Sequence, residues 1–166
     1  PIIPIYTINL KDVDLKLNCN SRTILKDIPL IELKSSLLND VEFMGSELHE
    51  KIRILAKKVS EFFQTDDNDC LAHHFAMHLN ELKFKFSSSV IKLGSLKYGN
   101  SFEAAFLFKV LADQLNIDAS FVAVDKNGKS WNEVCNGNNI VDLIFDIGEI
   151  YESTSYAAQK YLQNIS

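Results

Sequence analysis

The segment 101–115 constrains the fold more than any other part of the chain, because it predicts a helix that is apolar around most of its circumference. Its apolar residues are Phe102, Ala105, Phe106, Leu107, Phe108, Val110, Leu111 and Ala112. A helix of this kind is stable only when other elements cover it on several sides. We therefore expect a buried central helix. The residues expected to be mostly buried are Phe106, Leu107, Val110 and Leu111.

A sheet is predicted after this helix, because the apolar pattern changes there to period two. The stretches ASFVAVD and KSWNEVC flank Asn127-Gly128, a dipeptide that favours a hairpin turn because both residues tolerate positive φ. The stretch NGNN then predicts a second turn. We expect a three-stranded antiparallel meander packed on the helix. Its predicted strands are 119–125, 129–135 and 140–145.

Two helices are predicted in the N-terminal half. The first spans about 46–63, with apolar residues at helical spacing and Ser46 as a candidate cap. The second spans about 70–84 and follows the acidic stretch QTDDND, which interrupts the pattern. A last helix is predicted at about 154–162. Helices, then a central helix, then a sheet indicate the α+β class.

The first forty residues are harder to interpret. Residues 1–10 contain Pro1 and Pro4 and predict an edge strand or an extended arm, whereas 11–40 are compatible with short strands or turns. We therefore divide the chain into an N-terminal arm or extension (1–40) and one domain (41–166). The first residue is proline and not methionine, so we expect a fragment of a longer protein.

The composition excludes several classes of function. The net charge is -5 and no basic stripe is visible, so nucleic-acid binding has no electrostatic support. The apolar runs are too short to cross a bilayer. The three cysteines form no CxxC pair, and the residues suggest no cofactor. A disulfide framework is not expected, and a cytoplasmic location fits this cysteine usage.

The start of the central helix carries the first candidate site. Asn100 is a favourable N-cap, and Glu103 completes a capping box, which places Ser101 in the first helical turn. A cysteine there would gain from the helix dipole, but a serine hydroxyl needs a neighbouring base. The sheet offers Lys129 and Asp142. An active hydrolase with a Ser101/Lys129 dyad and Asp142 is therefore an alternative.

A second alternative is a metal site. Cys70, His73, His74 and His78 fall on the predicted second helix, and the first, third and fourth share one face. Together, Cys70, His74 and His78 could bind zinc. Structural zinc sites usually draw ligands from two elements, so we expect no metal here. The histidines are then solvated or hydrogen-bonded, and Cys70 is a small core residue.

Three stretches carry a family resemblance: LGSLKYGNSFEAAFLFKVLADQL, NGKSWNEV and IVDLIFDIGEIY. In this order and spacing they resemble the peptidase-like domain of plant Raf-like kinases of the enhanced-disease-resistance and constitutive-triple-response type. The same domain closes animal armadillo-repeat-containing proteins linked to cilia and sperm. The resemblance is densest over 90–151 and weaker over 52–83. It implies a papain- or transglutaminase-like core.

The resemblance also assigns site positions. The family commonly has Gly-x-Cys-Arg-His-Arg-Ala at the helix start, and residues 99–105 read GNSFEAA, so Ser101 holds the cysteine slot and Glu103 the histidine slot. The catalytic histidine, two residues before a tryptophan, corresponds to Lys129. The carboxylate slot retains Asp142. Two of the three triad positions have changed, which implies a degenerate triad and no enzyme activity.

The resemblance therefore predicts a non-catalytic interaction or scaffolding module, expected in an armadillo-repeat protein of cilia or sperm flagella. Its expected partners are proteins, with the armadillo repeats of the same chain as one candidate. No nucleic acid or membrane is expected to bind. The location implied is cytoplasmic, in a cilium or flagellum.

Overall fold

The computed structural model describes residues 5–11, 13–17, 22–63, 71–88, 90–124 and 129–165. Helices combine with an antiparallel four-stranded sheet, which confirms the predicted α+β class. The chain forms two compact units, each built from two separate stretches. One unit comprises Asp40–Gln64 and Gly99–Ser166, and the other comprises Ile2–Asn39 and Thr65–Tyr98. The first contains the sheet and is called the sheet unit, and the second is called the N-terminal unit.

The sheet unit is built on the predicted meander and one further strand. The strands, β5 (Ala119–Val124), β6 (Lys129–Val134), β7 (Asn139–Val141) and β8 (Ile150–Glu152), are antiparallel and pair in chain order. The third strand is shorter than predicted, because the chain leaves it at Asp142. The sequence did not predict β8, which is too short to show a period. The predicted Asn127-Gly128 turn lies outside the described residues.

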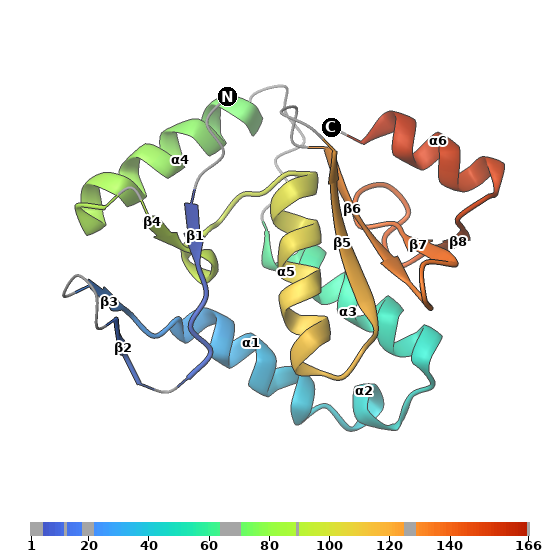
Figure 1. Ribbon diagram of the computed structural model, residues 1–166, viewed down its shortest axis with the longest axis horizontal. Helices are drawn as coiled ribbons and strands as arrows, with labels where there is room; N and C mark the ends of the chain where they lie inside the picture. The colour runs from blue at the N-terminus through green and yellow to red at the C-terminus, as the bar shows by residue number, and fades with distance from the viewer. Residues whose placement is uncertain are drawn as a thin grey trace. The chain divides into compact units, whose positions relative to one another are not determined.

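The central helix is α5 (Ser101–Gln114), which packs against β5 and β6 (Figure 1). Leu107, Val110 and Leu111 are buried as predicted. Phe106 is only half-buried, because its ring lies among those of Phe102 and Phe121 at the margin of the core. The helix α3 (Leu48–Phe62) also contacts α5. Its buried residues are Ile52, Leu55, Ala56 and Val59.

The predicted cap of α3 is wrong. Ser46 instead ends a short helix, α2 (Val41–Gly45), and its N–H donates to the Phe43 carbonyl. The N-cap of α3 is Glu47, which makes no side-chain capping bond. A serine before an apolar periodic run is equally suited to either role, so the sequence pattern alone could not separate them.

The helix α6 (Tyr156–Asn164) covers the face of the sheet turned away from α5 (Figure 1). Ser155 caps it, since its hydroxyl accepts a hydrogen bond from the Ala158 N–H. Its buried contacts form a cluster with the sheet: Ile140, Ala158, Tyr161 and Ile165, with Trp131, Tyr151 and Leu162 around them. Both faces of this sheet are therefore covered.

In its described residues, the N-terminal unit contains two separate two-stranded sheets and two helices. β1 (Ile5–Thr7) pairs in parallel with β4 (Val90–Lys92), and β2 (Leu15–Leu17) pairs antiparallel with β3 (Arg22–Ile24). The remaining elements are α1 (Ile28–Leu38), α4 (Leu71–Phe86) and the 3₁₀ turn η1 (Leu93–Ser95). None of the helices in the described part of the chain is long and apolar enough to cross a membrane.

The structure corrects the interpretation of residues 11–40. The segment 28–38 is a helix and not strands or turns, because Asp27 caps it and Leu30 and Leu37 are fully buried. The Asp27 carboxylate also accepts hydrogen bonds from the N–H of Gly94 at 2.8 Å and of Leu30 at 3.4 Å. A side chain at Gly94 would overlap this carboxylate, since a Cβ there would lie 2.0 Å from its Oδ1.

The division into an extension over 1–40 and one domain over 41–166 stays a prediction. The Asp27 N–H donates to the carbonyl of Asn9, and the Asp27 carboxylate binds Gly94, while β1 pairs with β4. These contacts join Asn9 to Asp27, and they join Asp27 and β1 to the segment after α4. Burial raises the pKa of Asp27, although the two backbone N–H groups partly oppose this.

Candidate functional site

The start of α5 has the capping box that the sequence predicts. Asn100 Oδ1 accepts from the Phe102 N–H at 2.9 Å, and Glu103 Oε2 accepts from the Asn100 N–H at 3.0 Å. Ser101 therefore occupies the first helical position. Its side chain is enclosed, with only 3% of the residue exposed.

The Ser101 hydroxyl oxygen lies against the backbone of β6. It accepts a hydrogen bond from the Ser130 N–H at a distance of 3.4 Å. On the side of β6 that faces β7, the ladder begins only at Asn132. The Asn132 amide binds the helix deeper in the same interface, donating to the Ala105 carbonyl at 2.9 Å. Among the described residues, the Asn132 Oδ1 atom is buried without a hydrogen-bond partner.

Lys129 lies on the other face of β6. Ser130, Asn132 and Val134 are the buried side of this strand. Lys129 and Trp131 alternate with them, and Trp131 packs on the α6 cluster. The Lys129 ammonium donates to the Gln163 carbonyl at 3.5 Å, near the end of α6. The hydrogen bonds of the described residues therefore do not join the Lys129 ammonium to the Ser101 hydroxyl.

Asp142 is buried, with 1% of the residue exposed, and its carboxylate closes the loop that follows β7. The N–H groups of Ile144 and Phe145 donate to Oδ1 at 2.9 Å. Oδ2 accepts from the Asp146 N–H at 3.2 Å and from the Tyr151 hydroxyl at 2.9 Å. Burial raises the pKa of Tyr151, and the neighbouring Asp142 adds to this effect. The carboxylate thus organises its own loop.

Two residues of this site were missed by sequence reasoning. Ser130 supplies the backbone donor for Ser101, and Tyr151 supplies a hydroxyl for Asp142. The alternation along β6 separates Ser130 from Trp131, so the sequence could have placed Ser130 on a face of its own. No pattern could have found Tyr151, because it lies in the unpredicted strand β8.

The proposed zinc ligands are only partly visible. Cys70 lies outside the described residues, and His73 is exposed on α4. His74 and His78 line a small cavity of about 200 Å³, with Glu81, Lys97 and Tyr98. Among the described residues, no three His, Cys, Asp or Glu side chains are arranged to hold a metal ion.

His78 is tied to the backbone instead. Only 7% of the residue is exposed, and its Nε2 accepts a hydrogen bond from the Lys97 N–H at 3.0 Å. Burial lowers the pKa of His78, and the Lys97 ammonium lowers it further, whereas Glu81 partly opposes both effects. The neutral imidazole, which alone can accept from an N–H, is therefore favoured in the folded state.

Acidification is expected to destabilise the protein through His78. Its pKa is lower when folded than when unfolded, so the unfolded chain binds the proton more readily below about pH 6.5. The contribution of His78 to the free energy of unfolding is therefore fully present above that pH, and it is lost as the pH falls through the pKa of the folded state. Urea unfolding at about pH 7.5 and about pH 5.5 measures this loss. His78→Gln should reduce it, and His73→Gln, on the exposed face of α4, should not; equal losses in both variants would contradict the assignment.

Cys135 is half-buried in the β6–β7 turn, where its φ of 55° lies in the left-handed region. Its Sγ is 3.9 Å from Nε2 of His49, in the first turn of α3. The sequence does not reveal this contact, because 86 positions separate the two residues. Cys19 lies outside the described residues.

Comparison with known proteins identifies the family. The model of a family described as EDR1/CTR1/ARMC3, peptidase-like, matches residues 9–150. Human Armadillo repeat-containing protein 3 is 31% identical over 133 residues, which cover 70% of this chain and 15% of that protein. No solved structure matches the chain. Because the family match extends over most of the sequence, the chain belongs to the EDR1/CTR1/ARMC3 peptidase-like family.

Proposed function

We propose that this chain is a non-catalytic peptidase-like domain that acts as a protein-interaction module. The observation that carries the proposal is the state of the Ser101 hydroxyl, which is buried and accepts a hydrogen bond from the Ser130 N–H. A nucleophile has to meet its substrate and lose its proton to a base. An enclosed hydroxyl is poorly placed to meet a substrate.

The acid and base candidates support the same conclusion. The Lys129 ammonium binds the Gln163 carbonyl, and a lysine must be neutral to act as a base. The Asp142 carboxylate is occupied by three N–H groups and one hydroxyl. Neither side chain is oriented to take the Ser101 proton in this geometry. The competing hydrolase would need Lys129 to change to the opposite face of β6.

The interaction role rests on context. The chain corresponds to a minor part of human Armadillo repeat-containing protein 3, whose name indicates repeats elsewhere in that protein. Repeat arrays of stacked helices offer long concave surfaces to partners. We propose protein partners, with such repeats as a candidate, and a location in cilia or sperm flagella on the ground of the family resemblance. Calorimetric titration of this domain with the human protein's repeat segment tests that candidate.

We expect no Ser101-dependent labelling by serine-hydrolase probes. A helix terminus stabilises an anion by only about 1–2 kcal/mol, which is too little to ionise a serine hydroxyl without a base. The assay labels the wild type, Ser101→Ala and, as a matched control in the same interface, Ser130→Ala. A label that is present in the wild type and lost only in Ser101→Ala would establish the hydrolase and overturn the proposal.

The thiol variants make the test sharper. Ser101→Cys alone should not gain activity toward thiol-directed probes above that of Cys135, because it lacks an imidazole that can shuttle the proton. Peptide mapping by mass spectrometry distinguishes the labelled cysteines. Efficient labelling of the new cysteine would show that the site remains open and supported.

A further inference from the structure

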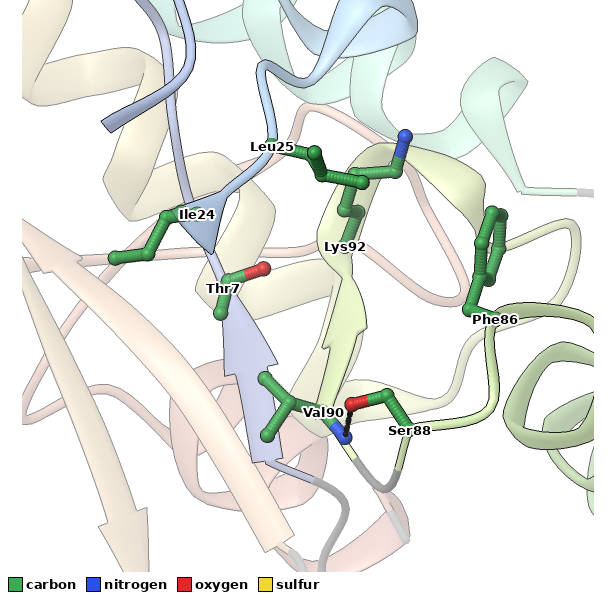
Figure 2. Close-up of a pocket in the computed structure, with 7 residues that line it drawn as sticks. All are labelled: Thr7, Ile24, Leu25, Phe86, Ser88, Val90 and Lys92. Atoms are coloured by element: carbon green, nitrogen blue, oxygen red, sulfur yellow. Dashed lines mark hydrogen bonds between the residues drawn. The ribbon is translucent and has the colours of Figure 1, made fainter. Parts of the chain in front are cut away.

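The N-terminal unit contains a cavity that the proposed function does not use. Its volume is about 210 Å³. Figure 2 shows Thr7 and Ile24 on one side of β4 and Phe86 on the other. The lining residues are Thr7, Ile24, Leu25, Phe86, Ser88, Val90 and Lys92. They come from β1, the end of β3 and the residue after it, the end of α4 and the turn after it, and β4.

The wall of this cavity is mostly apolar, and the charged residue that lines it, Lys92, is positive. Ile24, Leu25 and Val90 are aliphatic, and no lining residue is acidic. The Lys92 ammonium lies 5.3 Å from the centre of the Phe86 ring, and the Lys85 ammonium lies 5.6 Å from the same centre. Both are within cation–π range. The aromatic wall therefore carries two positive charges.

The Lys92 charge is not neutralised by a close partner. Within the described ranges it forms no ion pair, and its ammonium lies over the Phe86 ring. Lys92 interacts electrostatically with the Asp27 carboxylate, which already accepts hydrogen bonds from the N–H groups of Gly94 and Leu30. An anion that entered the cavity would thus meet an unpaired ammonium.

The hydroxyl groups of the wall add hydrogen-bonding capacity. Ser88 Oγ accepts from the Val90 N–H at 3.1 Å, as Figure 2 shows. This bond uses an oxygen lone pair, so the Ser88 hydroxyl proton remains able to donate. Figure 2 shows the Lys92 ammonium at the other end of the lining, so this hydroxyl and the charged donor would contact different parts of a ligand. A carboxylate is an acceptor only, and a charged donor binds it more strongly than a neutral one.

We propose that this cavity binds a short apolar chain that ends in a carboxylate. The aliphatic side chains would enclose the chain, and the Lys92 ammonium would hold the carboxylate. An apolar cavity of about 150 Å³ binds benzene, so a volume of about 210 Å³ suits a slightly larger ligand. This is the size of a six-carbon acid or of one C-terminal leucine. The proposal is independent of whether Ser101 is catalytic.

Hexanoate is the probe for the shared chemistry. Titration followed by amide chemical shifts should give saturable changes at Thr7, Ile24 and Val90. Hexanol, which has the same chain without the charge, should bind about tenfold more weakly, because it loses the charge-assisted contact. Hexylamine should not compete, since its ammonium would face Lys92.

Two variants decide whether the cavity is responsible. Lys92→Met keeps the length of the side chain and should weaken hexanoate about tenfold while leaving hexanol unchanged. Lys85→Met is the matched control, because this lysine stacks on the same ring but does not line the cavity. Leu25, which is 46% exposed, can be replaced by tryptophan to fill the cavity without cutting into the core. Leu25→Trp should abolish binding of both probes.

A further arm separates the two sources of such a ligand. A tripeptide ending in leucine is compared as free acid and as amide, beside hexanoate. Tighter binding of the peptide acid assigns the site to protein C-termini, and tighter binding of hexanoate assigns it to free acids. Equal binding of hexanoate and hexanol, an unchanged affinity in Lys92→Met, or no saturable shift with either acid would overturn the proposal.

Discussion

Replacing Asp142 with alanine is expected to lower the free energy of unfolding by about 3–5 kcal/mol. The carboxylate is buried and accepts three N–H groups and the Tyr151 hydroxyl. Hydrogen bonds to a charged group contribute more than neutral ones, and the substitution would leave several donors without a partner. The loop after β7 should lose its fixed form, and β8 should be weakened with it.

Urea unfolding followed by far-ultraviolet circular dichroism measures this change. Tyr151→Phe removes one donor and leaves the other three bonds, so it should cost only about 1 kcal/mol. Asp146→Ala is the matched control, because its side chain is exposed and its N–H remains. A loss for Asp142→Ala no larger than that for Asp146→Ala would show that the carboxylate does not organise the loop.

The second large effect is expected in the core of the central helix. Phe108→Ala should lower the free energy of unfolding by about 3–5 kcal/mol. Phe108 is fully buried and is among the largest such side chains of the described residues. Its removal forfeits the transfer of an aromatic ring from water and leaves a cavity between closely packed elements.

Phe106→Ala is the comparison for this prediction. Phe106 lies two positions away on the same helix, but it is half-buried and touches Phe102 and Phe121 at the margin. Its truncation should cost clearly less, because part of the ring is already in water. If both variants lost the same stability in chemical denaturation, the assignment of the core to the Phe108 face would be wrong.

Local sequence determined the helix at the centre of the sheet unit. The pair Asn100 and Glu103 defines its first turn through contacts three residues apart, and such contacts form wherever the helix forms. Its apolar circumference required burial, and Leu107, Val110 and Leu111 are buried. The period of two after this helix likewise predicted the strands, because it depends only on the pleat of the backbone.

Other features were decided by contacts between distant segments. Helix α1 depends on Asp27, whose carboxylate both caps the helix and accepts from the Gly94 N–H, 67 residues away. The strand β8 acquires its identity from pairing with β7, since three residues are too few to show a period. The role of Asp142 as a loop acceptor likewise requires Tyr151 from that strand.

The two faces of β6 at the candidate site could also not be assigned from the sequence. The sequence separated Lys129 and Trp131 from Ser130 by alternation, but alternation does not tell which face meets which helix. In a sheet with one solvated face, hydrophobicity would have marked the inner side. Here α5 covers one face and α6 covers the other, so both faces carry buried residues. The tertiary structure alone directed Ser130 to Ser101 and Lys129 to the end of α6, because only the packing of the two helices distinguishes the faces.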